Sequence, residues 1–303
     1  MSTTTLTDLA SETQFAGPLW LREGVGALYA KGEVHTGPFS MPLLRMAGLD
    51  KLPTTGHISI LDLCCGTGIT TCNLHILFKE QGIQDNIDLI CGDLSAGQLQ
   101  FLDRRIKEMQ WKNTKTIQIN AQKTNLPSHV FDYITCVFGL MVIPDSQAAL
   151  EECYRMLKPG GILGCVVWYK ELWSDYVRDA LCQLPGHPNW PESSDELTDA
   201  WAQGPWSNPH YVRSMLHRRG FVNIEMQTKS IMIDFKNAED FYEVYDAFIE
   251  WVTDRYWTEQ EKKLCRPLIK PAVVRFMEDK YGKNKPFAIE KIAIMAAAKT
   301  PAL

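Results

Sequence analysis

Residues 60–68, Ile60-Leu-Asp-Leu-Cys-Cys-Gly-Thr-Gly68, are the stretch that decides the fold of this chain. An apolar strand reaches an acidic residue here, Asp62, and a turn of small residues follows. A turn without bulky side chains lets another molecule lie directly against the backbone. The helix expected over residues 69–79 directs its free amide groups toward that molecule. The stretch therefore predicts a binding site for a nucleotide-type cofactor.

Two features of the turn decide between cofactors. A dinucleotide fingerprint needs a third glycine, but the frame from Gly66 reads Gly-Thr-Gly-Ile-Thr-Thr, with threonine in that place. Asp62 is poorly suited to a pyrophosphate, because two anions repel each other in a site of low dielectric, whereas it suits an ammonium group. S-adenosylmethionine carries an ammonium and a sulfonium group and no phosphate, so the turn favours it over a dinucleotide.

The next strand supports the same cofactor. Residues 87–93, Ile-Asp-Leu-Ile-Cys-Gly-Asp, are mostly apolar and end at Asp93. A carboxylate at the end of that strand can accept hydrogen bonds from both hydroxyl groups of a ribose. We therefore predict Asp93 as the ribose ligand and Ser95 as the N-cap of the following helix.

Over roughly residues 58–168 the sequence resembles the class I, seven-strand S-adenosylmethionine-dependent methyltransferases. The resemblance is strongest to the small-molecule branch that includes ubiquinone- and sterol-type enzymes. One such motif is weak, but five in the family's order and spacing are specific. Besides the turn, the motifs are Gly92-Asp-Leu-Ser95, Asn120-Ala-Gln-Lys-Thr-Asn-Leu-Pro127, Phe131-Asp-Tyr-Ile-Thr-Cys-Val-Phe138, Glu152-Cys-Tyr-Arg155 and Leu157-Lys-Pro-Gly-Gly161.

For the methionine part of the cofactor, the resemblance implies contacts with Gly66 and Gly68 and places Asp62 where it orients the ammonium group. Cys64 departs from the family's pattern, because it occupies the position of the turn's first glycine, so the backbone there must tolerate a side chain. Tyr29, at the end of an expected amino-terminal helix, is a candidate to close over the methionine carboxylate; the alternative is a packing role.

For the adenosine part, the resemblance implies that Asp93 holds the ribose and Leu94 packs on the adenine. Asn120 and Ala121 stand where the family meets the adenine edge. Asn120 replaces the commoner aspartate, and its carbonyl can still accept from the adenine amino group, though without a charge. Phe138 stands at the end of the fourth strand, where backbone groups face the cofactor in the family.

Composition and charge indicate a soluble enzyme. The 303 residues suffice for one large domain or two small ones, and the formal net charge of −5 argues against a nucleic-acid-binding surface. The nine cysteines include no CxxC pair, so we expect neither a disulfide framework nor a metal site. The first residues lack a signal peptide, and no apolar run is long enough to span a membrane. We predict a cytoplasmic monomer or homodimer without membrane or nucleic-acid partners.

Alternating strand and helix patterns predict an α/β fold: a doubly wound, mostly parallel seven-strand sheet with helices on both faces and a helical, aromatic-rich lid. We divide the chain into an N-terminal helical cap (1–57), a Rossmann-like cofactor-binding core (58–168), and a third part (169–303). The third part combines a lid insertion with C-terminal strands and helices that complete the same domain. The resemblance implies that one of the last two strands runs antiparallel.

The predicted elements follow the local patterns of the sequence. Lys158-Pro-Gly-Gly161 should end a helix and start the fifth strand. Residues 169–210, rich in Trp, Pro, Ser and Asn, show little periodicity and predict an insertion over the sheet. Helices are expected over 18–30, 38–48, 69–79, 97–109, 146–157, 207–219, 237–256 and 258–280, and strands over 58–63, 87–92, 115–120, 131–137, 161–168, 221–235 and 288–298.

Transfer of a methyl group from a sulfonium is an in-line displacement. Alignment of the two reactants alone is worth ~7–11 kcal/mol in favourable cases. A phenol, acid or protonated amine acceptor also needs a base. His35, which precedes Thr36-Gly-Pro-Phe39 in the segment expected over the cofactor, is the first candidate and His210 the second. Either histidine can equally be an ordinary packing or surface residue.

Aromatic residues of the third part are candidates to wall the acceptor pocket. Trp168 and Trp173 are favoured, because the end of the fifth strand lies beside the methyl group of the cofactor in the resembling fold. The other tryptophans are interpreted as core or lid packing.

The sequence therefore predicts transfer of a methyl group from S-adenosylmethionine to an N, O or S atom of a small specialised metabolite. One alternative is a protein that binds the cofactor and catalyses a non-methylating rearrangement or cyclisation. Another is a protein methyltransferase. Many amino-group and nucleic-acid methylating relatives carry an Asn/Asp-Pro-Pro-Tyr-type motif after strand four, where this chain reads Val137-Phe-Gly-Leu140. This difference favours a small-molecule acceptor.

Overall fold

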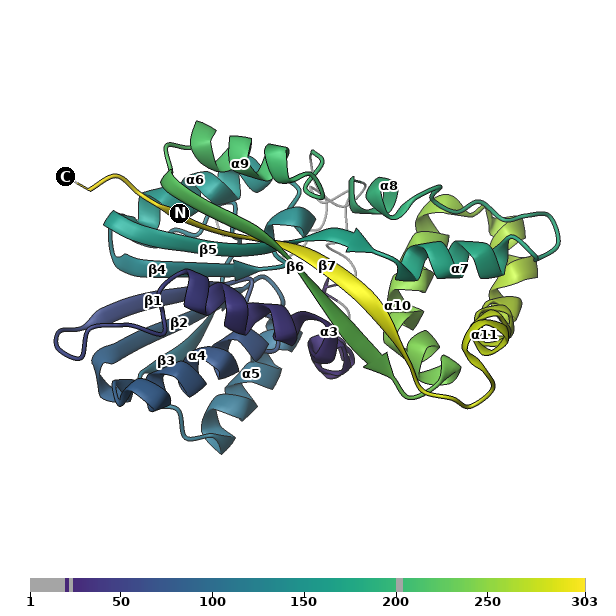
Figure 1. Ribbon diagram of the computed structural model, residues 1–303, viewed down its shortest axis with the longest axis horizontal. Coiled ribbons are helices and arrows are strands. Elements are labelled where there is room, and N and C mark those ends of the chain that lie inside the picture. Colours follow the sequence, from purple (N-terminus) through teal and green to yellow (C-terminus); the bar gives the residue numbers. More distant parts are fainter. Residues whose placement is uncertain (1–19, 22–23, 200–203, 303) are drawn as a thin grey trace, which may run out of the picture. The chain divides into compact units, whose positions relative to one another are not determined.

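The computed structural model describes residues 20–21, 24–199 and 204–302 (Figure 1). Its elements, in chain order, are α3 (Val25–Met46), β1 (Ile58–Leu63), α4 (Ile69–Gln81), η1 (Gln84–Asn86), β2 (Ile87–Asp93), α5 (Ala96–Glu108), β3 (Thr114–Gln118), β4 (Phe131–Val137), η2 (Leu140–Val142), α6 (Ser146–Met156), β5 (Leu157–Glu171), α7 (Trp173–Leu181), α8 (Ser194–Asp199), α9 (Pro209–Arg218), β6 (Val222–Phe235), α10 (Ala238–Tyr256), α11 (Glu259–Tyr281) and β7 (Phe287–Lys299).

The seven strands form one sheet in the order β3-β2-β1-β4-β5-β7-β6. β1 pairs in parallel with β2 and β4, and β3 and β5 continue the parallel pairing on either side. After β7, the Thr300 amide donates to the Gly161 carbonyl and the Gly160 amide donates to the Pro301 carbonyl, which is an antiparallel pattern. This mostly parallel sheet confirms the predicted fold class. The strand order reverses between β1 and β4, where open α/β sheets bind their ligands at the carboxyl ends.

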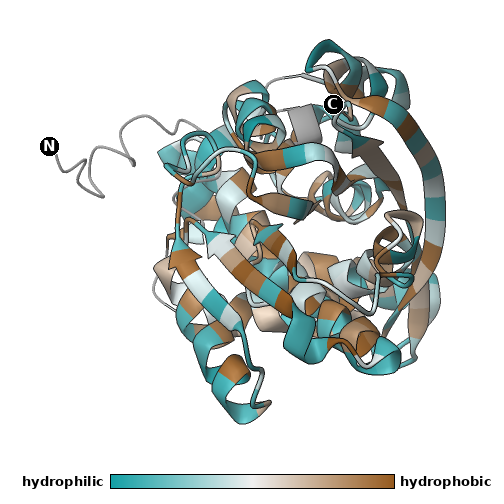
Figure 2. Ribbon diagram, turned by 90° about the vertical axis from the view of Figure 1, so that its left-hand side faces the viewer, coloured by the Kyte–Doolittle hydropathy of each residue, from teal (hydrophilic) through white to brown (hydrophobic). Residues whose placement is uncertain are grey.

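Helices cover both faces of the parallel strands. Crossovers between parallel strands are right-handed, so α4 and α5, which lead from β1 to β3, lie on the opposite face from α6, which leads away from β4 (Figure 1). Buried side chains of α3, α4, α5, β1 and β2 form one apolar cluster that includes Leu44, Leu74, Leu102, Ile60 and Leu89. Figure 2 shows apolar residues along the strands and mixed apolar and polar residues on the helices.

The amino-terminal region forms the long helix α3, so the prediction of separate helices over 18–30 and 38–48 is wrong; residues 18–19 and 22–23 lie outside the described residues. Pro38 and Pro42 lie inside α3, although each removes one amide donor. Close packing on α4 compensates, because Gly37 lies so near Ile69 that a Cβ there would be 2.7 Å from its side chain. Asn73 of α4 also donates to the Gly37 carbonyl at 3.4 Å.

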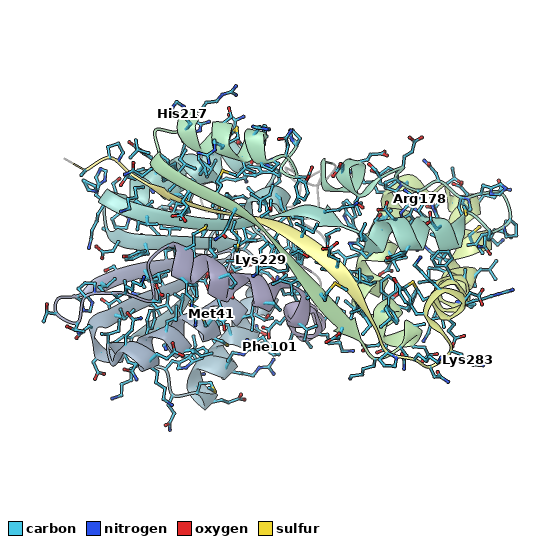
Figure 3. The ribbon with its side chains drawn as sticks, viewed as in Figure 1. Met41, Phe101, Arg178, His217, Lys229 and Lys283 are labelled. Carbon is cyan, nitrogen blue, oxygen red and sulfur yellow. The ribbon has the colours of Figure 1, made fainter. Side chains whose placement is uncertain are left out.

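α3 lies across both α4 and α5. Figure 3 labels Met41 on α3 and Phe101 on α5. Met41 packs against the apolar cluster of the parallel strands. At the other end of the helix, a Cβ on Gly26 would lie 2.6 Å from the Gly97 carbonyl oxygen and 3.1 Å from Cβ of Phe101. Glycine therefore permits this close crossing of α3 over the start of α5.

The predicted break at Lys158-Pro-Gly-Gly161 is a bulge within β5, and the strand begins at Leu157. Phe131 pairs with Leu157, but two residues later Tyr133 pairs with Ile162, so the four residues 158–161 of β5 lie opposite the single residue Asp132 of β4. A Cβ on Gly161 would lie 2.9 Å from the Lys158 carbonyl oxygen. The glycines therefore shape the bulge without interrupting the strand.

The chain divides into two compact units. The first comprises Met1–Tyr169, Trp201–Lys229 and Ala293–Leu303, and the second comprises Lys170–Ala200 and Ser230–Ile292. The three-part division expected from the sequence stays a prediction.

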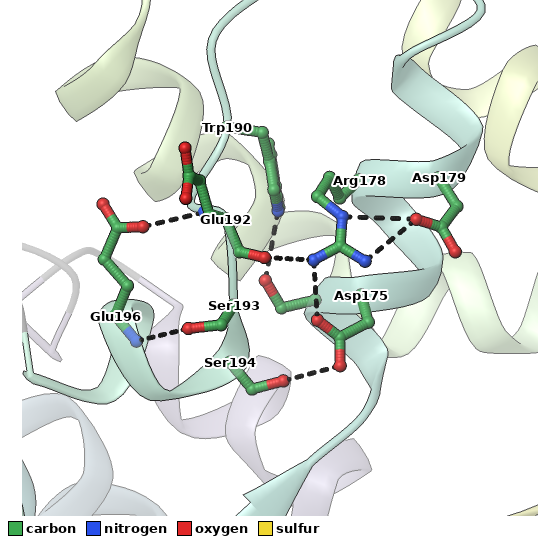
Figure 4. A network of polar contacts seen from close by, with 9 residues as sticks. Asp175, Arg178, Asp179, Trp190, Glu192, Ser193, Ser194 and Glu196 are labelled. Carbon is green, nitrogen blue, oxygen red and sulfur yellow. Dashed lines mark hydrogen bonds and ion pairs between the residues drawn. The ribbon is translucent and has the colours of Figure 1, made fainter.

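The second unit contains α7, α8, α10 and α11, so residues 169–210 include two helices that the sequence pattern did not indicate. Arg178 of α7 contacts Asp175, Asp179 and the Glu192 carbonyl, and Ser194 donates to Asp175 at 3.0 Å (Figure 4). This network fixes the segment that leads to α8. No helix in the described ranges is both long and apolar enough to cross a membrane.

Candidate cofactor site

The turn after β1 is built from left-handed backbone. The φ angles of Cys64, Gly66 and Gly68 are 57°, 56° and 93°. Cys64 therefore accepts a conformation that costs a side-chain-bearing residue ~1–2 kcal/mol. Gly68 permits α4 to start close to α5, because a Cβ there would lie 2.3 Å from Cδ1 of Leu102. The Cys65 amide donates to the Gly92 carbonyl at 3.1 Å, which joins the turn to the end of β2.

Asp93 connects the turn to the start of α5. Its Oδ2 accepts from the Gly66 amide at 2.9 Å, and its Oδ1 accepts from the Ser95 amide at 2.9 Å. Burial raises the pKa of Asp93 above its ordinary value, and the bonds from Ser95 and Gly66 oppose this rise. The backbone amide of Leu94 also bonds to this carboxylate. The lone-pair positions that these amides leave unoccupied can accept from ligand hydroxyl groups. Ser95 caps α5, as predicted, by accepting from the Gln98 amide.

Asp62 lies at the centre of the sheet and is 1% exposed. Its Oδ2 accepts from the Thr71 hydroxyl at 2.7 Å and its Oδ1 accepts from the Thr135 hydroxyl at 2.8 Å. Burial raises the pKa of Asp62 to about 6, although both threonine hydroxyls lower it. The two threonines fix the carboxylate beneath the glycine turn.

The titration of Asp62 predicts a pH-dependent stability. Because the pKa is about 6 when folded and near 3.8 otherwise, the folded chain binds more protons than the unfolded chain between these values. The free energy of unfolding therefore falls as pH rises through this window, by about 3 kcal/mol in total. Urea denaturation of wild type and Asp62→Asn from pH 3.5 to 7.5 checks this. The stability of the variant relative to wild type should rise with pH up to about pH 6 and then level off. A difference that does not change with pH would contradict the prediction.

Gln98 is a site residue that sequence reasoning missed. Its side chain is 4% exposed, and its Oε1 atom has no hydrogen-bond partner among the described residues. A Cβ on Gly66 would lie 2.8 Å from this oxygen and 3.4 Å from Cε1 of Tyr29. The sequence contained one indication of this residue: Gln98 is a glutamine on the apolar side of the helix, in line with Leu99 and Leu102. Tyr29 lies within α3, not at the end of a helix as predicted.

A cluster of Glu33, Thr67 and Arg105 joins α3 to the turn. Arg105 donates to both Glu33 oxygens, at 2.8 and 3.0 Å, and to the Thr67 carbonyl at 3.1 Å. The Thr67 hydroxyl donates to Glu33 at 2.6 Å. A bidentate arginine–carboxylate pair is geometrically specific. This cluster fixes one side of the turn, while Asp93 fixes the other.

The end of β3 lies beside Asp93. The Ile119 amide donates to the Asp93 carbonyl at 2.9 Å. Asn120, the next residue, accepts at Oδ1 from the Gln122 amide at 3.0 Å and from Gln122 Nε2 at 3.3 Å. Ala121 is buried. Leu94, on the neighbouring strand end, accepts at its carbonyl from Gln118 Nε2 at 2.9 Å.

Three aromatic rings meet at the ends of β4 and β5. Phe138, in the left-handed conformation at φ 58°, stacks on Trp168 with ring centroids 4.0 Å apart. Phe39 of α3 contacts both edge-on, at 5.7 and 5.4 Å. The Phe138 amide donates to the Val166 carbonyl at 2.8 Å. A strained non-glycine residue at a strand end is a common mark of a functional site.

The remaining candidates from the sequence are two histidines and one tryptophan. His35 is buried on α3, 4% exposed, and His210 is exposed at the start of α9. Trp173 belongs to the second unit, where it stacks on Tyr245 at 4.8 Å. The proposed roles of these three residues stay predictions. All nine cysteines are free thiols, and the described residues contain no group of three or more His, Cys, Asp or Glu side chains placed to hold a metal ion.

Comparison with known proteins agrees with this geometry. Residues 47–180 match the model of the ubiE/COQ5 methyltransferase family. Methyltransferase tpcH of Aspergillus fumigatus is 29% identical, over 90% of this chain and 95% of its own length. Acetylaranotin bis-thiomethyltransferase of Aspergillus terreus is 27% identical, over 93% and 97%. A solved structure of phosphoethanolamine N-methyltransferase 2 from Haemonchus contortus, bound to S-adenosylhomocysteine, shares the fold with a TM-score of 0.51 at 17% identity, over 86% of this chain and 52% of that one.

The fold and the site define a Rossmann-like S-adenosylmethionine-dependent methyltransferase. The chain is an S-adenosylmethionine-dependent methyltransferase, and its residues 47–180 are similar to the ubiE/COQ5 methyltransferase family. S-adenosylmethionine is therefore its cofactor. The residues fit this group, because the buried Gln98 oxygen has no hydrogen-bond partner among the described residues and lies beside the glycine turn.

Proposed function

We propose that this methyltransferase acts on a small organic molecule and that the accepting atom is N, O or S. Two observations on relatives support a small acceptor: full-length similarity to fungal methyltransferases, and the name of one of them, a bis-thiomethyltransferase. When bound, S-adenosylmethionine supplies an electrophilic methyl group on its sulfonium, which an aligned nucleophile displaces in line. The observation that carries the proposal is the position of Gly66 between the Asp93 carboxylate, which accepts from its amide at 2.9 Å, and the buried Gln98 oxygen, which has no hydrogen-bond partner among the described residues.

The cofactor-binding roles follow from the contacts around the turn. Asp93 would accept from the ribose hydroxyls with its remaining lone pairs, and Asp62 would orient the ammonium group from below the turn. The backbone of Gly66 and Gly68 would contact the methionine part, with Cys64 beside them, and the Tyr29 ring lies 3.4 Å from the position of a Cβ on Gly66. On the adenosine side, the proposed contacts are Leu94, Asn120 and Ala121, and the backbone of Phe138, after β4, would face the cofactor.

The aromatic group of Phe39, Phe138 and Trp168 is the proposed acceptor wall of the first unit. Stacked and edge-on rings form a flat, rigid apolar surface, and such surfaces position planar molecules with little loss of conformational entropy. Because these rings hold one another, alignment of the acceptor would not depend on a flexible side chain.

Product analysis tests the proposal. The full-length chain is incubated with S-adenosylmethionine labelled on the methyl group and an extract of small molecules from its source. We expect label in a small molecule and release of S-adenosylhomocysteine in equal amount. Label in the protein fraction would overturn the small-molecule proposal in favour of a protein acceptor. A transformed molecule without S-adenosylhomocysteine would indicate rearrangement or cyclisation.

A further inference from the structure

Two thiols meet at the turn that follows β1. Cys64, the first residue of the turn, is partly exposed, and Cys136 of β4 is 0% exposed. The Cys64 thiol hydrogen-bonds to the Cys136 thiol. A Cβ on Gly139 would lie 2.6 Å from Sγ of Cys136 and 2.9 Å from Sγ of Cys64. The two sulfurs therefore share the space that a side chain at position 139 would take.

The backbone of Cys64 distinguishes this pair from ordinary packing. Its φ angle is 57°, in the left-handed region that glycine adopts freely and that a residue with a side chain adopts at a cost. The resembling family has glycine at this position, which would relieve the strain but remove the thiol. Strained residues of this kind cluster at functional sites. A use for the Cys64 thiol would account for the strain.

We infer that Cys64 and Cys136 are an oxidative modification site, in which hydrogen peroxide joins the two thiols into a disulfide, and that this disulfide weakens cofactor binding. One oxygen of the peroxide is transferred to the Cys64 sulfur, which becomes a sulfenic acid, and the other leaves as water. The Cys136 sulfur then attacks the Cys64 sulfur and the S–O bond breaks. The leaving hydroxide takes the Cys136 proton and forms a second water, so one peroxide removes two electrons from two thiols.

The surroundings of the two thiols decide which of them reacts first. The hydrogen bond with Cys136 and burial both raise the pKa of Cys64 above its ordinary value. The bond from Cys64 lowers the pKa of Cys136, but burial raises it overall. Both thiols are therefore protonated at neutral pH, and their oxidation is slow. Because Cys64 is the partly exposed thiol of the pair, it meets the peroxide first and Cys136 resolves the intermediate.

The disulfide would displace the turn, and its effect on binding rests on the proposed contact of this turn with the methionine part of the cofactor. An S–S bond is about 2 Å long, far shorter than the separation of two hydrogen-bonded thiols, so the Cys64 backbone must move toward β4. The Cys65 amide donates to the Gly92 carbonyl at 3.1 Å. The Gly66 amide donates to Asp93 at 2.9 Å. Movement of Cys64 strains both bonds, which join the turn to the end of β2.

Calorimetric titration with S-adenosylhomocysteine, before and after treatment of the full chain with hydrogen peroxide, tests the inference. Oxidised wild type should bind at least about tenfold more weakly, because the bond to the Asp93 carboxylate is weakened. Dithiothreitol should restore the affinity. Cys136→Ala and Cys64→Gly should each bind equally before and after treatment. Bound S-adenosylhomocysteine should slow the oxidation of wild type, since coupling between two sites is reciprocal.

Peptide mapping by mass spectrometry without reductant should show Cys64 linked to Cys136. Cys65→Ala should still form this link, which separates Cys64 from its neighbour in the same peptide. The matched control is Cys182→Ala, which removes an exposed thiol of the second unit and should lose affinity on oxidation as wild type does.

Three results would overturn the inference: a link from Cys136 to a different cysteine, an unchanged affinity after oxidation, or an equal loss of affinity in Cys136→Ala. Failure of the reduced chain to bind S-adenosylhomocysteine would instead overturn the proposed cofactor site. The mapping would then still decide whether the disulfide forms.

Discussion

Asp93→Ala should bind S-adenosylhomocysteine at least a hundredfold more weakly than the wild-type chain. Hydrogen bonds to a charged group are worth ~1.5–3 kcal/mol each, so the loss of two ribose contacts costs about 3 kcal/mol or more. The substitution also removes the acceptor of the Gly66 amide, and the turn loses one of the bonds that fix it. Isothermal titration calorimetry measures the change in affinity directly.

Two further variants separate the role of the carboxylate from the effect of removing any charge. Asp88 lies on the same strand, is exposed and follows the start of β2, so Asp88→Ala should keep wild-type affinity. Asp93→Asn keeps the shape and one acceptor oxygen, and we expect affinity between those of the wild type and the alanine variant. Asp93→Ala that binds within threefold of wild type while melting normally would contradict the ribose role.

Asp93 and the glycine turn could be predicted from the sequence because their signals are local. β1 begins and ends at the predicted residues 58 and 63, and Asp93 ends β2 as expected. In a parallel sheet, residues that follow the ends of neighbouring strands meet at one edge, so the strand pattern alone places the turn beside Asp93. Apolar residues at the spacing of a strand or of a helix can be recognised within a few residues of sequence, and they locate the ends of these elements.

The contacts of α3 could not be predicted in the same way. Glu33 meets Arg105 across 72 positions of sequence, and no local pattern links them. The helix also passes through two prolines, because packing against α4 and α5 outweighs the local preference to stop. The β5 bulge could not be predicted for the same reason. Glycines ordinarily indicate a turn, and only the pairing with β4 shows that the strand continues through them.

A second substitution with a large expected effect concerns a buried ion pair in the second unit. Lys291 of this unit is only 1% exposed. Its Nζ lies 2.6 Å from Oε1 of Glu171, and the other Glu171 oxygen accepts from the Trp173 indole at 3.0 Å. Nζ also lies 5.1 Å from the ring centroid of Tyr245, which stacks on Trp173. Burial lowers the pKa of Lys291, but the Glu171 carboxylate and the Tyr245 hydroxyl together raise it above its ordinary value, so the ammonium stays charged inside the protein.

Glu171→Gln should lower the free energy of unfolding by ~3–5 kcal/mol, because it leaves a buried ammonium without its counter-charge. Lys291→Met should also lower the free energy of unfolding, since it leaves the Glu171 carboxylate without its counter-charge. The double variant Glu171→Gln/Lys291→Met should recover most of the two single losses, because it leaves no buried charge without its partner. Urea denaturation followed by tryptophan fluorescence gives all three values.

The pair Lys262–Glu259 on α11, whose carboxylate is exposed, provides the matched control. Its nitrogen and oxygen are 2.8 Å apart, but the Glu259 side chain is 90% exposed, so Glu259→Gln should cost less than about 1 kcal/mol. The decisive quantity is the coupling between positions 171 and 291. If the double variant loses the sum of the two single losses, each side chain stabilises the unit separately, through its own packing and hydrogen bonds. If the double variant recovers, the unpaired charge causes the loss, and the pair selects one arrangement of β5 and β7 without adding net stability.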